Sequence, residues 1–333
     1  MINRKKFIQL GSLGLGSILV NKSLANTSIA STTDHVFKAE GIKFGVIADL
    51  HHDLMHDGLR RAKLFIEAMK NENPDFIISL GDFCFPKAKN KELMAIWDGF
   101  TGERHFVIGN HDTDGGFTKQ QVTDFWNSPA PYYSFDKQGF HFVILDGNEK
   151  SLTKKIEGYP RSIGQQQLEW LKKDIRNTKK RVIIFCHQGL DNEDGGLENG
   201  MAVRYLLEQM NIEAGFNKIL LVLTGHHHLN YHNEINGIHY VQINSASYYW
   251  AGDTFESKAF DADFYKKHGI LKRTLVYQDP IWATVSIDHK KNIRIQGSET
   301  TMAGIPLAQT GIDIYKDVYP ISAKIDSRHL RYR

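Results

Sequence analysis

The chain contains little cysteine and no long apolar run, and these absences exclude several classes of protein. Only two of the 333 residues are cysteine, Cys84 and Cys186, too few for a disulfide framework. No segment is long and apolar enough to predict a mature transmembrane helix, and no cysteine stands where a bacterial lipoprotein would need one. The sequence also lacks internal repeats and low-complexity tracts. Its length fits one large α/β domain or two small ones.

A charge excess of one sign is also missing. The formal net charge is +3, but the first thirty residues supply four of the basic residues and no acidic one. The remainder has 37 basic and 38 acidic residues. A nearly neutral body argues against binding a nucleic-acid backbone through charge alone.

The first thirty residues have the composition of an export signal. "NRKKF" is a basic start, "IQLGSLGLGSILV" a weakly apolar stretch too short to span a bilayer, and "SLA" or "SIA" a cleavage site. The segment resembles a twin-arginine signal with Lys5 in place of the second arginine. We therefore expect export, in a bacterium to the periplasm. An uncleaved N-terminal anchor is the alternative.

The rest of the chain alternates short apolar runs with amphipathic ones, which predicts βαβ units and an α/β fold. Strands are expected at 42–48, 75–80, 104–109, 140–146, 181–186 and 218–225, and helices at 58–72, 90–100, 164–177 and 199–211. Hairpins are expected at 231–243, through the turn dipeptide Asn236-Gly237, and at 281–297. We place one domain at 31–300 and an irregular tail at 301–333.

Polar residues gather where the expected strands end. The sequences "ADLHHD", "GDF", "GNHD", "CHQG" and "GHHHL" each follow one strand. Loops that leave the carboxyl ends of strands in open α/β sheets are where sites assemble. One such histidine alone would more often be a hydrogen-bonded loop residue, but five loops together predict a site.

The residue types indicate two metal ions. Carboxylates, imidazoles and an amide oxygen suit Mn, Fe, Zn or similar ions, and the set is too large and too scattered for one structural zinc. A carboxylate such as Asp82 can bridge two ions about 3.5 to 4 Å apart.

These motifs, in this order, resemble the signature of the calcineurin-like metallophosphoesterases. The resemblance covers residues 42 to about 245 and implies a four-layer α/β/β/α sandwich. It implies that one metal is held by Asp49, His51 and His228, that the other is held by Asn110, His187 and His226, and that Asp82 bridges them. His227 is expected to point elsewhere, and His52 and Asp53 lie outside the pattern.

The expected reaction is phosphoester hydrolysis by a hydroxide shared between the metals. His111 is expected to lie near the phosphate without binding metal and to act as general acid. Asp112 is either a group that orients a site histidine or a turn residue, and the sequence favours neither role.

Some residues differ from those of well-known branches of this family, and these differences indicate which branch the chain resembles most. Phe85 and Pro86 stand where purple acid phosphatases have tyrosine and protein serine/threonine phosphatases have an Asp-Arg pair. "FGVIAD", "YYSFD", "LDGN" and "GQQQLEWL" are more similar to cyclic-nucleotide phosphodiesterases and to manganese-dependent ADP-ribose and CDP-alcohol diphosphatases.

Substrate contacts are expected outside the motifs. Tyr248, Tyr249 and Trp250 could stack on a base or sugar, although packing in the core or a lid is the commoner role of such residues. Basic residues that could meet a remote phosphate are Lys266, Lys267, Lys272 and Arg273, although a solvated loop is the commoner role of such residues. Arg161 is a further residue expected at the rim of the site.

We therefore expect an exported hydrolase that cleaves a phosphodiester or pyrophosphate bond in a small, nucleotide-like molecule. Phosphomonoester hydrolysis and a non-catalytic metal-binding protein of the same fold are the alternatives, and a nuclease is disfavoured by the neutral charge.

Overall fold

The computed structural model describes residues 41–333, apart from 152–156, 193, 316 and 333. The predicted export signal lies outside the described residues. The described residues belong to one compact unit. Among the described residues, no helix combines the length and the apolar character that crossing a bilayer requires.

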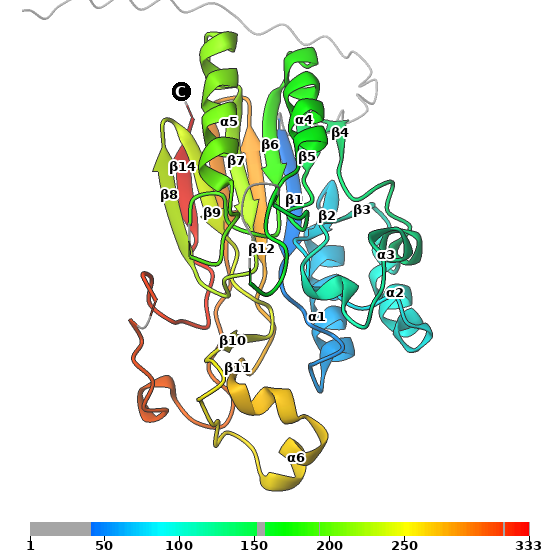
Figure 1. Ribbon diagram of the computed structural model, residues 1–333, viewed down its shortest axis with the longest axis vertical. Coiled ribbons are helices and arrows are strands. Elements are labelled where there is room, and N and C mark those ends of the chain that lie inside the picture. Colours follow the sequence, from blue (N-terminus) through cyan, green and yellow to red (C-terminus); the bar gives the residue numbers. More distant parts are fainter. Residues whose placement is uncertain (1–40, 152–156, 193, 316, 333) are drawn as a thin grey trace, which may run out of the picture. The chain divides into compact units, whose positions relative to one another are not determined.

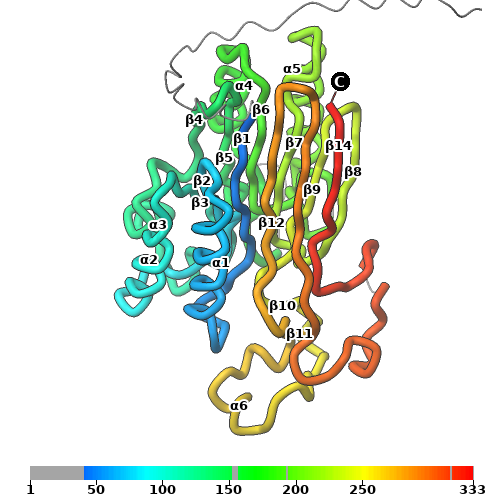
Figure 2. Tube along the Cα trace, turned by 180° about the vertical axis from the view of Figure 1, so that it is seen from behind, coloured from blue at the N-terminus to red at the C-terminus, as the bar shows by residue number. Residues whose placement is uncertain are grey.

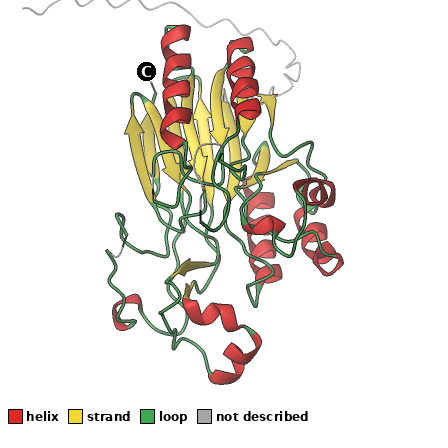
Figure 3. Ribbon diagram, viewed as in Figure 1, coloured by secondary structure: helices red, strands yellow, loops and turns green. Residues whose placement is uncertain are grey.

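Two six-stranded sheets form the centre of this unit (Figure 3). The first sheet has the order β14 (Arg328–Arg331), β13 (Asn292–Gln296), β12 (Ala283–Asp288), β1 (Gly41–Ile47), β2 (Phe76–Ser79) and β3 (Glu103–Phe106). The second has the order β4 (Tyr133–Lys137), β5 (Phe140–Ile144), β6 (Arg181–Phe185), β7 (Ile219–Thr224), β9 (Ile238–Gln242) and β8 (Tyr231–Ile235). β10 (Tyr248–Trp250) and β11 (Thr274–Val276) pair separately.

Helices cover the outer faces of the two sheets. Figure 1 shows α4 (Gln165–Asn177) and α5 (Gly200–Ala214) in front of the second sheet, and Figure 2, from behind, shows α1 (Gly58–Glu72) over the first. α2 (Lys91–Trp97) packs on α1, whereas α3 (Lys119–Trp126) and α6 (Ala262–Lys267) are shorter. Short 3₁₀ helices span Ala88–Asn90, His111–Thr113, Gly269–Arg273 and Leu307–Gln309.

Each sheet packs on both of its faces, because successive side chains of a strand point to opposite faces. This produces the layers. In β1, Phe44 and Val46 enter the core between the sheets, while Ile47 packs with the α1 residue Phe65. In the second sheet, Phe142 faces the same central core, whereas its neighbour Val143 packs under α4 and α5. The predicted four-layer α/β/β/α sandwich is confirmed.

The predicted strands and helices are all present, with ends shifted by a few residues. Six elements were not predicted: α3, α6, β4, β10, β11 and β14. The segment predicted to be an irregular tail therefore contains a strand, since Arg328–Arg331 pairs with β13 at the edge of the first sheet. Cys84 and Cys186 are buried and unpaired with each other, like small apolar residues.

Candidate metal centre

All seven predicted ligands lie in loops at one end of the two sheets. β1, β2 and β3 run parallel in the first sheet, and β5, β6, β7 and β9 run parallel in the second. Their carboxyl ends therefore meet at the same edge, where the loops after β1, β2, β3, β6 and β7 begin. Each motif identified in the sequence occupies one of these loops.

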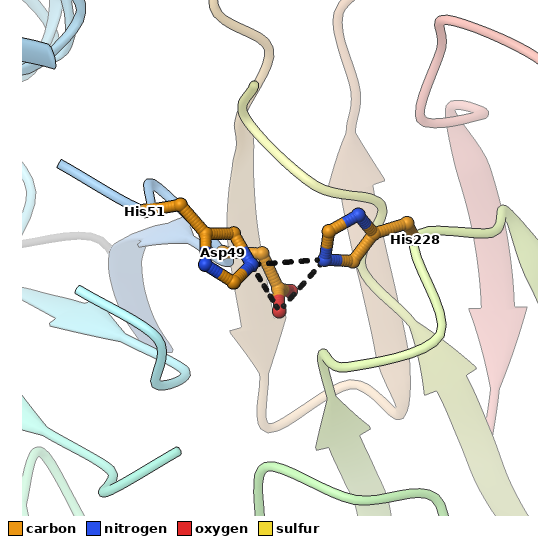
Figure 4. A group of neighbouring side chains, drawn as sticks. All are labelled: Asp49, His51 and His228. Carbon is orange, nitrogen blue, oxygen red and sulfur yellow. Dashed lines mark hydrogen bonds and ion pairs between the residues drawn. The ribbon is translucent and has the colours of Figure 1, made fainter. Parts of the chain in front are cut away.

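The first metal-binding group consists of Asp49, His51 and His228 (Figure 4). His51 Nε2 lies 3.2 Å from His228 Nε2, and Asp49 Oδ1 lies 3.3 Å from His228 Nε2 and 3.9 Å from His51 Nε2. All three side chains are buried. Three donor atoms from two sheets thus converge on one point.

The second group consists of Asp82, His187 and His226. His187 Nδ1 donates to the carbonyl of Leu80 at 2.8 Å, which leaves Nε2 as the donor atom for a metal. That Nε2 lies 3.1 Å from Asn110 Oδ1 and 3.3 Å from Asp82 Oδ2. The amide oxygen of Asn110 is therefore available to the same ion.

Asp82 lies between the two groups. Its Oδ2 is 3.3 Å from His187 Nε2 in the second group and 3.6 Å from His51 Nε2 in the first. Its Oδ1 accepts a hydrogen bond from the backbone N–H of His111 at 2.8 Å, which fixes the orientation of the carboxylate. This is the position from which one carboxylate can contact two ions.

The spacing of the donor atoms fits metal coordination. Ligands about 2.1 Å from one ion are about 3.0 Å apart in octahedral and about 3.4 Å apart in tetrahedral geometry. The separations of 3.2 and 3.3 Å between neighbouring donor atoms fall in this range. Buried carboxylates facing imidazole nitrogens also suit an N/O site for a divalent ion.

Five ligands adopt a backbone conformation that non-glycine residues rarely use. The φ angles of Asp49, His51, Asp82, His226 and His228 lie between +48° and +76°. Left-handed conformations of this kind cost of order 1–3 kcal/mol each and cluster at functional sites. The surrounding contacts of the loops must therefore offset the conformational cost of these five residues.

Neighbouring charges and burial set the protonation of the ligands. Burial acts to raise the pKa of Asp82, but His187 and His51 hold it well below its usual range. Burial lowers the pKa of His51 to about 3, so its imidazole is neutral and free to coordinate. Burial opposes protonation of His187, but Asp82 and Asp49 raise its pKa to about 9. A metal ion replaces that proton when it binds.

His111 stands beside the metal groups without belonging to either. Its Nδ1 lies 2.7 Å from Asp114 Oδ2, and Tyr159 Oη donates to Asp114 at 2.9 and 3.0 Å. The side chain of His111 is 32% exposed and lines the cavity above the site. Because a carboxylate accepts, Nδ1 carries the proton and Nε2 is left to exchange one with a ligand.

Asp114 and Tyr159 were not identified from the sequence. Asp114 lies three residues after His111, within reach in the helical turn His111–Thr113, and this spacing was the available signal. Tyr159 is 48 positions away in a segment without a motif, so nothing in the sequence connected it with His111.

Asp112 organises the loops. Its carboxylate accepts hydrogen bonds from the backbone N–H groups of Asp82, Phe83, Cys84 and Gly109, at 2.7 to 3.1 Å. It is buried and is not among the described residues that line the main cavity. Of the two roles that the sequence left open, these contacts favour the turn residue. Asp53, which accepts from Phe85 N–H and Asn90 Nδ2, likewise holds a loop.

A cavity of about 540 Å³ opens above both groups. The predicted contact residues Tyr248, Tyr249 and Trp250 all line it. Tyr248 is buried and its ring lies 5.0 Å from the rings of His51 and of His228. Burial, with Asp82 and Asp49, raises its pKa well above the usual value, so it forms a neutral wall. Trp250 is 39% exposed. His227 also lines the cavity but belongs to neither metal group.

A four-layer sandwich with two ligand groups at its loop edge defines a dinuclear metal protein of the metallo-dependent phosphatase fold. Residues 42–230 match the family of calcineurin-like phosphoesterases. The chain belongs to this family and is a metal-dependent phosphoester hydrolase.

Two solved structures share the fold. A dimetal phosphatase from Danio rerio is 14% identical with a TM-score of 0.59, over 88% of this chain and 99% of that chain. GAP50, the anchor in the inner membrane complex of Plasmodium, is 15% identical with a TM-score of 0.53, over 88% and 89%. No curated protein matches the sequence.

Proposed function

We propose that this chain is exported and hydrolyses a phosphodiester or pyrophosphate bond in a small, nucleotide-like molecule, with His111 as general acid. The observation that carries the proposal is the position of His111. It lines the same cavity as ligands of both metal groups, and its ring centroid lies 5.3 Å from that of His51.

The two metal groups would hold Mn, Fe or Zn ions. Bound there, the ions would supply charge neutralisation for the phosphoryl oxygens and a nucleophile at neutral pH. Asp82 would hold both ions at a fixed separation because its carboxylate is already oriented by the N–H of His111.

The protein's own groups supply the remaining parts of the reaction. Asp114 fixes the ring of His111 through Nδ1, so that Nε2 can give a proton to the oxygen that leaves the phosphate. Proton transfer by a positioned side chain contributes on the order of 100- to 10,000-fold. Tyr248, packed against His51 and His228, excludes water from one side of the site.

The size of the cavity supports a small substrate. About 540 Å³ falls within the range of about 300–1,000 Å³ that is usual for small-molecule sites. The tyrosines and tryptophan at 248–250 offer ring surfaces on which a base could stack. Kinship with the cyclic-nucleotide phosphodiesterases, or with the manganese-dependent ADP-ribose and CDP-alcohol diphosphatases, stays a prediction.

The test is hydrolysis by the full-length chain of bis(p-nitrophenyl) phosphate and of p-nitrophenyl phosphate. Each is measured with added Mn, Zn or Fe and with chelator, and Asp82→Asn is the blank. We expect metal-dependent turnover that favours the diester and that Asp82→Asn lacks. A higher kcat/KM for the monoester would replace the proposal by a phosphomonoesterase. Metal binding without turnover on either ester would favour a non-catalytic protein.

A further inference from the structure

Part of the cavity wall lies outside the metal groups and is apolar. Trp250, Ile270 and Val318 line the cavity, and they are 39%, 40% and 81% exposed. Large apolar side chains that are exposed in a concave site gain stability when a ligand covers them. We call these three residues, with Tyr319, Asp194 and Asp317, the distal wall.

The charged side chains of the distal wall are acidic. Asp194 and Asp317 line the cavity, and no lysine or arginine is found among its described lining residues. Asp317 also accepts a hydrogen bond from Tyr249 Oη, which keeps its carboxylate at the wall. A second phosphate is normally held by arginine or lysine side chains. The carboxylates of the described distal wall would instead repel a second phosphate group of the substrate.

The basic residues that the sequence suggested for a remote phosphate do not contribute to the described distal wall. None of them is a described lining residue of the cavity. Lys266 pairs with Asp263 at 2.7 Å, Lys272 with Glu256 at 3.2 Å, and Arg273 and Arg161 donate to the carbonyls of Phe255 and Gly196.

We infer that the distal wall binds an uncharged or cationic ring-containing group, so that the substrate is a phosphodiester with one phosphate and not a pyrophosphate. The inference rests on the proposed function, because the scissile phosphate must lie at the metal groups. The ring stacks on Trp250, while Asp194 and Asp317 exclude substrates with a second phosphate by repulsion.

The deciding comparison uses two ligands that differ by one phosphate: bis(p-nitrophenyl) phosphate and P1,P2-bis(p-nitrophenyl) pyrophosphate. Binding to the Mn-loaded protein is measured by rapid mixing, before turnover, and turnover is followed chromatographically. We expect the diester to bind at least about 10-fold more tightly. Equal or tighter binding of the pyrophosphate overturns the inference.

Two variants test which residues set the preference. Trp250→Ala is expected to raise KM for the diester about 5- to 100-fold, the range for loss of one stacked ring, with kcat nearly unchanged and with rescue by Trp250→Phe. Tyr205→Ala, which removes an exposed aromatic residue on α5 outside the cavity, is the control. If both alanine variants behave alike, Trp250 does not contact the substrate.

Charge reversal tests the acidic part of the wall. Asp194→Lys is expected to shift the diester-to-pyrophosphate binding ratio about 5-fold toward the pyrophosphate, whereas Asp263→Lys, at an exposed site away from the cavity, leaves it unchanged. An unchanged ratio in Asp194→Lys contradicts the inference. Absence of turnover on either ligand contradicts the proposed function alone, because the binding preference measured by rapid mixing still decides the substrate class.

Discussion

Asp114 holds His111 through one of its two ring nitrogens: Asp114 Oδ2 lies 2.7 Å from His111 Nδ1. Tyr159 donates to the same carboxylate. A carboxylate in this position fixes the tautomer and the orientation of the imidazole. The arrangement predicts a positioning role for two residues that bind no metal.

Asp114→Asn is expected to lower kcat about 10- to 100-fold without loss of metal, because the charge beside His111 is removed. Tyr159→Phe should lower it only several-fold. The effect should be large for diesters with a poor alkyl leaving group and small for p-nitrophenol, which departs without a proton. Asp124→Asn, on the exposed side of α3, is the control. An equal loss with both leaving groups would contradict the role in proton transfer.

Asp82→Asn and His111→Ala are expected to separate metal binding from proton transfer. Asp82 contacts both metal groups, so its substitution should empty the centre and abolish turnover together. His111→Ala should cut turnover of diesters with a poor alkyl leaving group by about 100-fold or more while metal content, measured by elemental analysis, stays near that of the wild type. Loss of metal from His111→Ala would show that His111 is a ligand.

Gly109→Ala is expected to disrupt the centre. A Cβ atom at this position would lie 2.1 Å from Asp82 Oδ1 and 2.3 Å from Asp82 N, so the bridging loop must move. We expect weaker metal binding and a loss of stability of about 1–3 kcal/mol, the usual cost of overpacking. Gly269→Ala is the matched control, because a Cβ there meets open space. Calorimetric metal titration and thermal melting measure both effects, and wild-type metal affinity in Gly109→Ala would contradict the prediction.

His141 is expected to make stability depend on pH. Burial lowers its pKa, but hydrogen bonds to Asp174 and Asp136, at 2.8 and 2.7 Å, raise it above 6.5 overall. A raised pKa stabilises the folded state below about pH 6.5, and this stability is lost as the pH rises through the raised value. Ion pairs that are partly exposed contribute on the order of 1 kcal/mol or less.

The corresponding variant is His141→Asn, with His329→Asn on the exposed edge strand as control. Free energies of unfolding are compared from pH 5.5 to 9. The difference in free energy of unfolding between wild type and His141→Asn should be largest at pH 5.5 and should decrease toward pH 9. A difference that does not change with pH would contradict a raised pKa for His141.

The layers and the ligands were predictable because they depend on local pattern. β1 and β7 are mostly apolar, and ligands follow within a few residues of their ends. α3 was missed because Lys119–Trp126 has few apolar positions, although its capping box, Thr118 with Gln121, was readable. β14 reads Arg-His-Leu-Arg at the edge of the sheet, so it has one apolar residue, Leu330, and no apolar run.

The roles of polar residues were harder to predict. Asp112 and Asp114 have the same side chain two positions apart, yet one is buried against four N–H groups and the other lies beside His111. Their roles depend on the direction of each side chain in the loop, which spacing alone does not determine. Tyr159 required the tertiary contact itself.

Each metal group takes ligands from both sheets: Asp49 and His51 follow β1, whereas His228 follows β7, 177 positions after His51. An ion bound there would therefore act as a removable cross-link that closes a very long loop. Cross-links of this length restrict the unfolded chain most, because the entropy cost of closing a loop grows with its length. The ions needed for hydrolysis would thus also link the two sheets to each other. Chelation would therefore lower the stability of the fold as well as stop the reaction.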